Sequence, residues 1–116
     1  MTVKLFGNNG IAGLRIKIGY DENAFELIQE SVKRGSAFNS LQFLDPIYRN
    51  DSFITSWFGW TNDLTDGTLL TFCLKAKPNI EEGYYPITIS YDENNTIDET
   101  GYQLFISAID GCIIVQ

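Results

Sequence analysis

Carboxylates are the most numerous side chains in this sequence that could perform acid–base chemistry. The chain holds 15 Asp and Glu residues, and two carboxyl groups facing one another could hydrolyse a glycosidic bond. The candidates are Asp21-Glu22, Asp63, Asp66, Asp92-Glu93 and Asp98-Glu99. Most of them lie in predicted turns, where a carboxylate is simply solvated. The sequence also contains no G-x-S-x-G motif and no glycine-rich phosphate loop, so we expect no enzymatic activity.

One acidic stretch has the spacing of a cation-binding loop. Asp92, Asn94, Thr96 and Asp98 alternate like the oxygen ligands of an EF-hand. However, an isoleucine stands at the sixth position, where that loop needs glycine, and a glutamine at the twelfth, where it needs glutamate. The chain has no histidine, which removes the usual zinc ligand and the commonest general base. We expect this chain to bind no metal and no other cofactor.

The two cysteines, Cys73 and Cys112, do not form a C-x-x-C pair, so metal binding and thioredoxin-like chemistry are not indicated. Both fall in predicted strands, and we place these strands in opposite sheets. A disulfide would require their Cα atoms to lie within about 7 Å. We therefore expect two free thiols.

Composition and charge limit the classes of partner. At 116 residues and 44% hydrophobic, the chain fits a single domain, residues 1–116, with one core. A net charge of −7 argues against nucleic acid, because binding phosphates needs a basic surface. No apolar run is long enough to cross a membrane. The first residues lack the features of a signal peptide, which does not place the protein in the cytoplasm.

The stretch from Gly10 to Asp21 has the clearest local pattern. Leu14, Ile16 and Ile18 alternate with Arg15 and Lys17, which is the period of a half-buried strand. A slip of one residue would turn the three apolar side chains outward, so this strand should set the register of its neighbours. Its polar face is either part of a binding surface or an ordinary solvated face.

Several other stretches predict strands, and no stretch predicts a convincing helix. A long connection without clear period runs from Ala37 to Asp51, and its apolar residues Phe38, Leu41, Phe43 and Leu44 should cover one end of the core. Asp110-Gly111 should form a bulge in the last strand. The strands are Thr2–Phe6, Phe25–Val32, Phe53–Trp60, Thr68–Lys77, Tyr84–Tyr91, a short one around Thr96–Asp98, and Leu104–Val115. Together they predict an all-β antiparallel sandwich.

Two of these strands could present side chains for binding. In Thr68–Lys77 the outward residues should be Thr71, Cys73 and Lys75. In Phe53–Trp60 they should be Thr55 and Trp57, and an outward tryptophan on a flat sheet would be a strong interface anchor. The alternative is a parity shifted by one, which buries Trp57 and turns Ser56 and Phe58 outward. Trp60 could contact a partner or cap the core, and Cys73 could simply be a small residue that packs well.

Four stretches, in this order, resemble the cohesin family, modules on the scaffolding proteins of cellulose-degrading bacteria that bind dockerin-bearing enzymes. They are GIAG with its alternating strand ending in YD (10–21), DLTDGTLLTF (63–72), EGYYPITISYD (82–92) and DGCIIV (110–115). The resemblance implies a flattened nine-stranded jelly roll whose first strand has no counterpart here, leaving about eight strands. The second and ninth family strands then either pair directly or leave an open edge.

The resemblance further implies a dockerin-binding sheet formed by four regions, Asn95–Glu99, Gly13–Gly19, Thr68–Lys77 and Phe53–Trp60. Its exposed residues would be Arg15, Lys17, Thr55, Trp57, Thr71, Cys73, Lys75 and Asp98, with Trp60, Asn62 and Asp63 at the rim. Two family positions that are usually Asn and Asp are Gly13 and Arg15 here. The partner should therefore differ, and it could offer a carboxylate to Arg15.

On this resemblance we expect a monomeric, non-catalytic module that binds a calcium-loaded dockerin, with the calcium held by the dockerin. It would assemble secreted polysaccharide-degrading enzymes, outside the cell or at its surface. The alternative is a carbohydrate-binding module in which Trp57, Trp60 and a tyrosine stack on sugar rings. A weaker third possibility is an adhesion or surface-layer sandwich without a soluble ligand.

Overall fold

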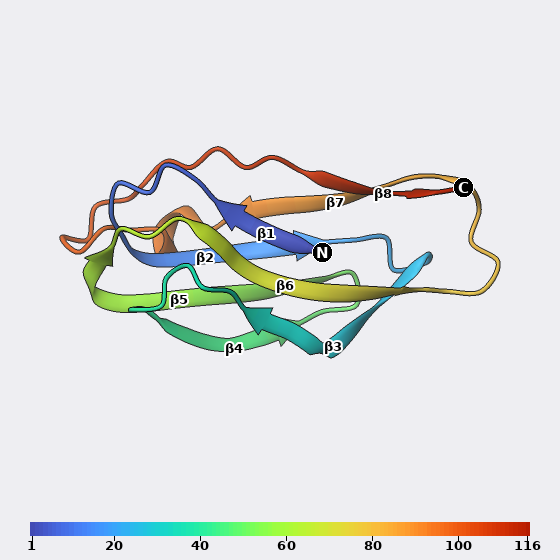
Figure 1. Cartoon of the computed structure of the whole chain (residues 1–116), viewed down its shortest axis with the longest axis horizontal. Helices are drawn as coiled ribbons and strands as arrows, with labels where there is room; N and C mark the ends of the chain where they lie inside the picture. Colours follow the sequence, from blue (N-terminus) through green and yellow to red (C-terminus); the bar gives the residue numbers. More distant parts are fainter.

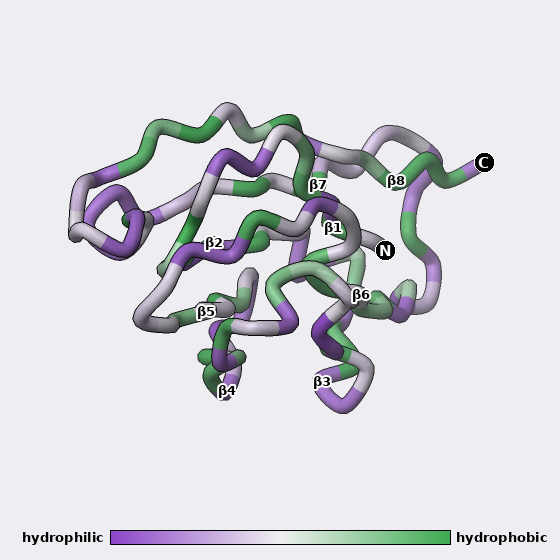
Figure 2. Tube along the Cα trace, turned by 60° about the vertical axis from the view of Figure 1, so that its left-hand side comes forward, coloured by the Kyte–Doolittle hydropathy of each residue, from purple (hydrophilic) through white to green (hydrophobic).

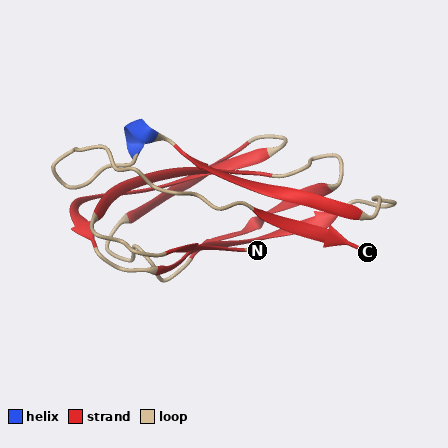
Figure 3. Cartoon of the chain, turned by 90° about the horizontal axis from the view of Figure 1, so that it is seen from above, coloured by secondary structure: helices blue, strands red, loops and turns tan.

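The computed structural model describes all residues from 1 to 116 and confirms an all-β antiparallel sandwich (Figure 1). A single 3-10 turn, η1, is the only helical element (Figure 3), and no helix is long and apolar enough to cross a membrane. The strands are β1 (Thr2–Leu5), β2 (Ile11–Gly19), β3 (Phe25–Arg34), β4 (Gln42–Tyr48), β5 (Ser52–Asp63), β6 (Gly67–Ala76), β7 (Gly83–Tyr91) and β8 (Gly111–Val115), with η1 at Glu93–Asn95 between β7 and β8.

The strands form two layers. Three strands make one sheet in the order β1-β6-β3, and five make the other in the order β4-β5-β2-β7-β8. All pairings are antiparallel. The molecule measures 49 × 25 × 23 Å along its principal axes, so the sandwich is elongated, with both layers extended along its length (Figures 1 and 3).

β2 is the central strand of the larger sheet, as its sequence predicts. It pairs with β5 on one side and β7 on the other. Leu14, Ile16 and Ile18 are buried against the smaller sheet, whereas Arg15 and Lys17 reach the outer side. The alternation of hydrophobic and hydrophilic residues along the strands is visible in Figure 2. Across the core, Phe53 of β5 meets Phe72 of β6 edge to face, with ring centroids 5.1 Å apart.

The prediction of an irregular connection from Ala37 to Asp51 is wrong over part of its length, because this stretch contains β4. β4 pairs with β5 at the edge of the larger sheet. Its pairing register shifts between Leu44 and Ile47, around Asp45-Pro46, and this bulge hides the alternation in the sequence. Proline is tolerated there because β4 is an edge strand. Phe38 and Leu41 are buried, as expected, but Leu44 faces outward.

β6 lies in the smaller sheet, so the predicted pairing of Thr68–Lys77 with the strands around β2 is wrong. β6 sits between β1 and β3, and β4 takes the place next to β5. The alternation within β6 is as predicted, with Leu70 and Phe72 buried. Alternation shows which side chains are buried, but it does not show which of the two layers a strand joins.

The C-terminal region is less regular than predicted. β8 covers only Gly111–Val115, and residues 104–110 form no strand. The short strand predicted around Thr96–Asp98 is reduced to a bridge, in which Ile97 pairs with Gly13 of β2. β1 pairs only with β6, and β8 only with β7. The second and last strands of the resemblance therefore do not pair directly, and the sandwich is open between β1 and residues 104–111.

Candidate docking face

The strongest candidate for a functional site is the outer face of the larger sheet where β4, β5 and β2 lie side by side. We call this surface the outer face. The side chains that define it point away from the core and are at least partly exposed. They are Arg15, Lys17, Leu44, Ile47, Ile54, Ser56, Phe58 and Trp60.

Strand register arranges these side chains in rows across the sheet. Ser56 pairs with Arg15 on one side and with Leu44 on the other. In the next row, Ile54 pairs with Lys17 and Ile47. Side chains that lie directly opposite one another on neighbouring strands are in contact range. The outer face is therefore mainly apolar along β4 and β5 and positively charged along β2.

An aromatic pair forms the most apolar part of the outer face. The rings of Phe58 and Trp60 meet edge to face with centroids 5.2 Å apart and planes at 77°. Phe58 is 40% exposed and Trp60 is 86% exposed. Between them, Gly59 lies over Leu41, and a Cβ at this position would come within 2.6 Å of the Leu41 side chain. The glycine lets the buried Leu41 support β5 from below while both rings remain on the surface.

The prediction that Thr55 and Trp57 face outward is wrong, and the shifted parity is correct. Trp57 is 1% exposed and contacts Phe38 and Phe43, with ring centroids 5.9 and 5.2 Å away. Thr55 is also fully buried. β5 carries apolar side chains on both faces, so hydrophobicity alone cannot determine its parity. Because Trp57 is in the core, it cannot form the sugar-stacking row with Trp60 that the carbohydrate-binding alternative requires.

Thr71, Cys73 and Lys75 are exposed, as their parity predicts, but they belong to β6 in the smaller sheet. They therefore lie on the opposite side of the sandwich from the outer face. Cys73 and Cys112 are both free and exposed. Of the predicted strand residues, only Arg15 and Lys17 lie on the outer face, and Trp60 joins them at the end of β5.

Asp63, predicted at the rim, is instead a buried structural residue. Its carboxylate accepts hydrogen bonds from the backbone and hydroxyl of Ser40 and from the backbone and hydroxyl of Thr65. Burial alone would raise the pKa of Asp63, but these four hydrogen bonds outweigh it and lower the pKa below its ordinary value. Asp63 joins the end of β5 to the loop before β4, so it supports the outer face without lying on it.

Asn62, predicted at the rim, and Asp98, predicted on a strand of the binding sheet, both hold turns beside Trp60. The Asn62 backbone donates to the Glu99 carboxylate, and the Glu99 backbone donates to the Asn62 side chain. Asp98 accepts from the hydroxyl and backbone of Thr100 and from the Tyr102 backbone. The Thr100 hydroxyl is the largest cause of the lowered pKa of Asp98. Both residues are thus engaged in shaping the rim.

Five residues of the outer face were missed by sequence reasoning. Leu44 and Ile47 were missed because the bulge concealed β4. Ile54, Ser56 and Phe58 were missed because the expected parity assigned them to the wrong side of β5. The sequence signal for this part of the surface is the pair Phe58 and Trp60, separated by Gly59. Residues two apart in a strand lie on the same face, so these two rings had to share one side of β5.

The arrangement suits the binding of a polypeptide. The structure contains no group of three or more His, Cys, Asp or Glu side chains that could hold a metal ion. Several acidic side chains accept hydrogen bonds within turns, as Asp63 and Asp98 do, and Asp92 caps η1. An apolar surface flanked by two cations can bind a polypeptide that presents apolar side chains next to carboxylates.

Comparisons with known proteins agree with this picture. The family model described as "Cohesin domain" matches residues 1–105. A search of curated proteins found no match. Among solved structures, the sixth cohesin of scaffoldin B from Acetivibrio cellulolyticus, in complex with a dockerin, is 20% identical with a TM-score of 0.77, covering 99% of this chain and 86% of that one.

Two further solved structures are similar. The OlpA cohesin in a type I cohesin–dockerin complex from Clostridium thermocellum is 20% identical with a TM-score of 0.76, covering 97% of this chain and 83% of that one. A non-cellulosomal cohesin from the archaeon Archaeoglobus fulgidus is 15% identical with a TM-score of 0.73, covering 96% of this chain and 73% of that one. At these identities the structures show a shared fold, and the family model identifies the family. This chain belongs to the cohesin domain family.

Proposed function

We propose that this chain is a non-catalytic interaction module that binds a dockerin through the outer face. The observation that carries the proposal is the exposed pair Phe58 and Trp60 beside Arg15 and Lys17 on a sheet of a cohesin domain. Aromatic side chains and arginine are the residues that most often dominate binding energy at protein interfaces. Two of the similar solved structures are complexes of a cohesin with a dockerin, which supports this choice of partner.

The chemistry of the outer face describes the partner surface that it fits. Phe58, Trp60 and the aliphatic side chains of β4 and β5 require apolar side chains in a matching ridge. Arg15 and Lys17 require carboxylates at one flank of that ridge, and the arginine can bind a carboxylate through two parallel hydrogen bonds. Any calcium in the complex belongs to the dockerin, and this chain contributes no cofactor.

We place the module outside the cell or at its surface, in a scaffold that gathers polysaccharide-degrading enzymes. The scaffoldin cohesin among the similar structures supports this setting. The similar archaeal cohesin is non-cellulosomal, so the fold alone does not assign a cohesin to an enzyme-gathering scaffold. Identification of the dockerin partner, and of the protein that carries it, tests this assignment.

The experiment is a calorimetric titration of the full chain with a panel of dockerins, in calcium and in chelator. Arg15→Glu and Lys75→Glu are matched charge reversals, one on the outer face and one on β6 of the smaller sheet. For the dockerin that binds, we expect Arg15→Glu to lower the affinity at least about tenfold. Lys75→Glu should leave the affinity unchanged. Equal effects of the two variants, or a larger loss of affinity in Lys75→Glu, would contradict an interface on the outer face of the larger sheet.

A further inference from the structure

A polar pocket of about 420 Å³ lies beyond the C-terminal end of β2, between β3 and the turn that joins β4 to β5. Tyr20, the residue that follows β2, lines it from the inner side of the sandwich. Glu22 in the next turn and Glu26 on β3 line one side of it, and Arg49 lines it from the β4–β5 turn. Only three of its nine lining residues are hydrophobic, so hydrogen bonds and charge decide what it binds.

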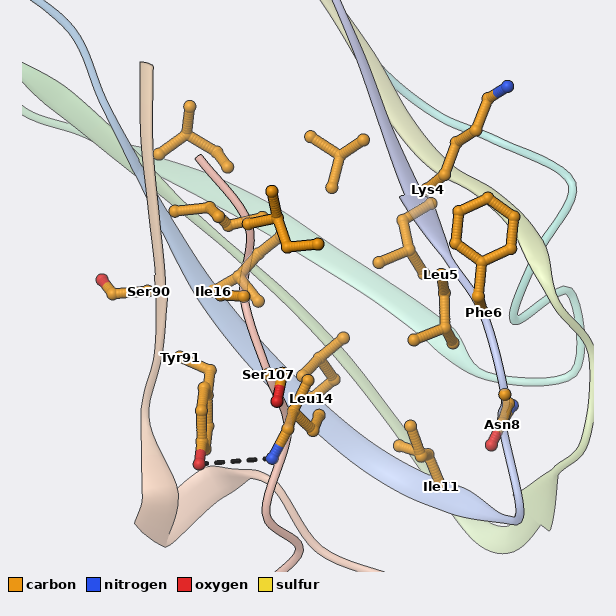
Figure 4. Close-up of a pocket in the computed structure, with 18 of the residues that line it drawn as sticks. Lys4, Leu5, Phe6, Asn8, Ile11, Leu14, Ile16, Ser90, Tyr91 and Ser107 are labelled. Carbon is orange, nitrogen blue, oxygen red and sulfur yellow. Dashed lines mark hydrogen bonds between the residues drawn. The ribbon is translucent and has the colours of Figure 1, made fainter. Parts of the chain in front are cut away.

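The Tyr20 hydroxyl is the unpaired polar group of this pocket. The side chain is 9% exposed, yet its hydroxyl makes no hydrogen bond. By contrast, the hydroxyl of Tyr91 accepts from the Ile106 N–H at 3.3 Å, the dashed line in Figure 4. The only sealed side-chain atoms without a partner are Thr55 Oγ1 and Trp57 Nε1, so the Tyr20 hydroxyl opens to the pocket that the residue lines. Because a buried tyrosine hydroxyl usually has a partner, the open position at Tyr20 marks a place for a ligand atom.

Carboxylates surround this hydroxyl. Burial raises the pKa of Tyr20, and the negative charges of Asp51, Glu22 and Glu26 raise it further. Glu22 is engaged only through its backbone, whose carbonyl accepts from the Lys77 ammonium at 2.6 Å. The carboxylates of Glu22 and Glu26 are therefore available as acceptors at the pocket that both residues line.

The two cations of the pocket already donate to backbone carbonyls. Lys77 donates to the carbonyl of Glu22, and the Arg49 guanidinium donates to the carbonyl of Tyr48 at 3.3 Å. The groups left open are mainly acceptors, namely the Tyr20 hydroxyl and two carboxylates. A ligand that carries positive charge and donates several hydrogen bonds is therefore favoured, and the net charge of −7 on the chain attracts it.

The arrangement favours an organic cation over a metal ion. The structure contains no group of three or more His, Cys, Asp or Glu side chains that could hold a metal ion. A primary ammonium has three N–H donors, which reach acceptors in separate directions and do not need them to converge on one point. Phe25 and Leu27 also line the pocket, and apolar side chains of this kind pack against the methylene groups of a long amine.

We propose that this pocket binds a primary alkylammonium group of the size of a lysine side chain, with its N–H groups bonded to the Tyr20 hydroxyl and to the carboxylates of Glu22 and Glu26. A free amine and a lysine of a partner polypeptide present the same group. The site is separate from dockerin binding, because Phe58 pairs with Gly13 near the start of β2 and Tyr20 follows its end.

The test is an NMR titration of the isotope-labelled full chain with Nα-acetyl-lysine methylamide, and with Nα-acetyl-norleucine methylamide as the control that lacks the ammonium. We expect the blocked lysine to shift the backbone amide signals of the pocket until they saturate, and the blocked norleucine to leave them in place. Pentylamine carries the same ammonium without a peptide backbone. Tighter binding of the blocked lysine than of pentylamine supports a polypeptide source, and the reverse order supports a free amine. No saturable shift with either amine, or equal shifts with the norleucine control, would overturn the proposal.

Protein variants locate the contact. Tyr20→Phe removes only the unpaired hydroxyl, so it should keep or raise the melting temperature while lowering the affinity for the blocked lysine about five- to tenfold. Tyr91→Phe, its matched control, removes a paired hydroxyl outside the pocket and should leave this affinity unchanged. Glu26→Gln should lower the affinity about tenfold, whereas Glu93→Gln, which removes the same charge from η1, should not. Equal affinities of the two tyrosine variants, or equal losses in the two glutamate variants, would contradict the site.

Discussion

Replacement of Trp57 tests the reversed parity of β5. Its indole is 1% exposed and contacts the rings of Phe38 and Phe43. Trp57→Ala should lower the free energy of unfolding by about 3–5 kcal/mol through the lost transfer energy and the cavity left behind. Two lost aromatic contacts of about 0.5–1.5 kcal/mol each place the expected value at the upper end. Because small domains are stable by only about 5–15 kcal/mol, this change should be severe.

Trp57→Phe is the matched variant, and its expected cost is much smaller. The indole N–H of Trp57 has no hydrogen-bond partner in the structure, and an unpaired buried donor costs about 1–3 kcal/mol. Phenylalanine removes this penalty and keeps a ring against Phe38 and Phe43. The gain offsets part of the lost volume, so we expect a net loss below about 2 kcal/mol.

Urea unfolding followed by circular dichroism measures both variants, and the midpoint shifts with an unchanged slope if only stability is altered. The folded Trp57→Phe variant should bind dockerin as tightly as the parent chain, because the side chain does not reach the outer face. A Trp57→Ala variant that unfolds at the same urea concentration as the parent chain but fails to bind dockerin would refute the burial of this residue.

Three further predictions concern residues that stabilise the fold. Asp63→Asn should lower the free energy of unfolding by about 1–3 kcal/mol at neutral pH, because an amide nitrogen meets N–H or O–H donors that the carboxylate accepts; denaturant titration measures it. Since hydrogen bonds lower the folded-state pKa of Asp63, its stabilising effect is complete above the unfolded-state pKa of about 3.9 and is lost as the pH falls through the lower folded-state pKa, so the two proteins should converge in strong acid. A constant difference down to that pH would argue against an ionised Asp63. Gly35→Ala places a Cβ against the backbone carbonyl oxygen of Thr68 and should cost about 1–3 kcal/mol, whereas unchanged thermal unfolding would show that the segment after β3 can move away from β6. Phe72→Ala should cost about 3–5 kcal/mol in the same assay, and a smaller loss than for an exposed phenylalanine such as Phe105 would contradict its place in the core.

The sequence predicted those elements in which only one face of a strand is apolar. β2 and β6 are examples, because cations or polar residues alternate with their buried side chains. In β5, Phe53 and Trp57 lie on one face and Phe58 and Trp60 on the other. The two faces are about equally hydrophobic, so the pattern alone does not show which face is buried. Packing of Trp57 between Phe38 and Phe43 decides between them, and both of those residues come from outside β5.

Layer membership depends on longer-range contacts than alternation records. β4 was not predicted because its bulge at Asp45-Pro46 interrupts the alternation of apolar and polar residues. Without β4, the position next to β5 in the sheet was assigned to β6 instead. Asp63 was misread for a related reason. Its type and position suggest a solvated turn, and only the fold brings Ser40 and Thr65 to its carboxylate.

The most direct measurement of the central claim is the affinity of one cognate dockerin for Trp60→Ala and Phe105→Ala. Both remove a highly exposed aromatic side chain, 86% and 87% exposed, one on the outer face and one in the segment between η1 and β8. Truncation of an interface tryptophan typically costs about 2 kcal/mol or more, so Trp60→Ala should lower the affinity for dockerin by roughly thirtyfold. Phe105→Ala should bind dockerin as tightly as the parent chain. Unchanged binding by Trp60→Ala, or equal losses in the two variants, would contradict a dockerin site on the outer face.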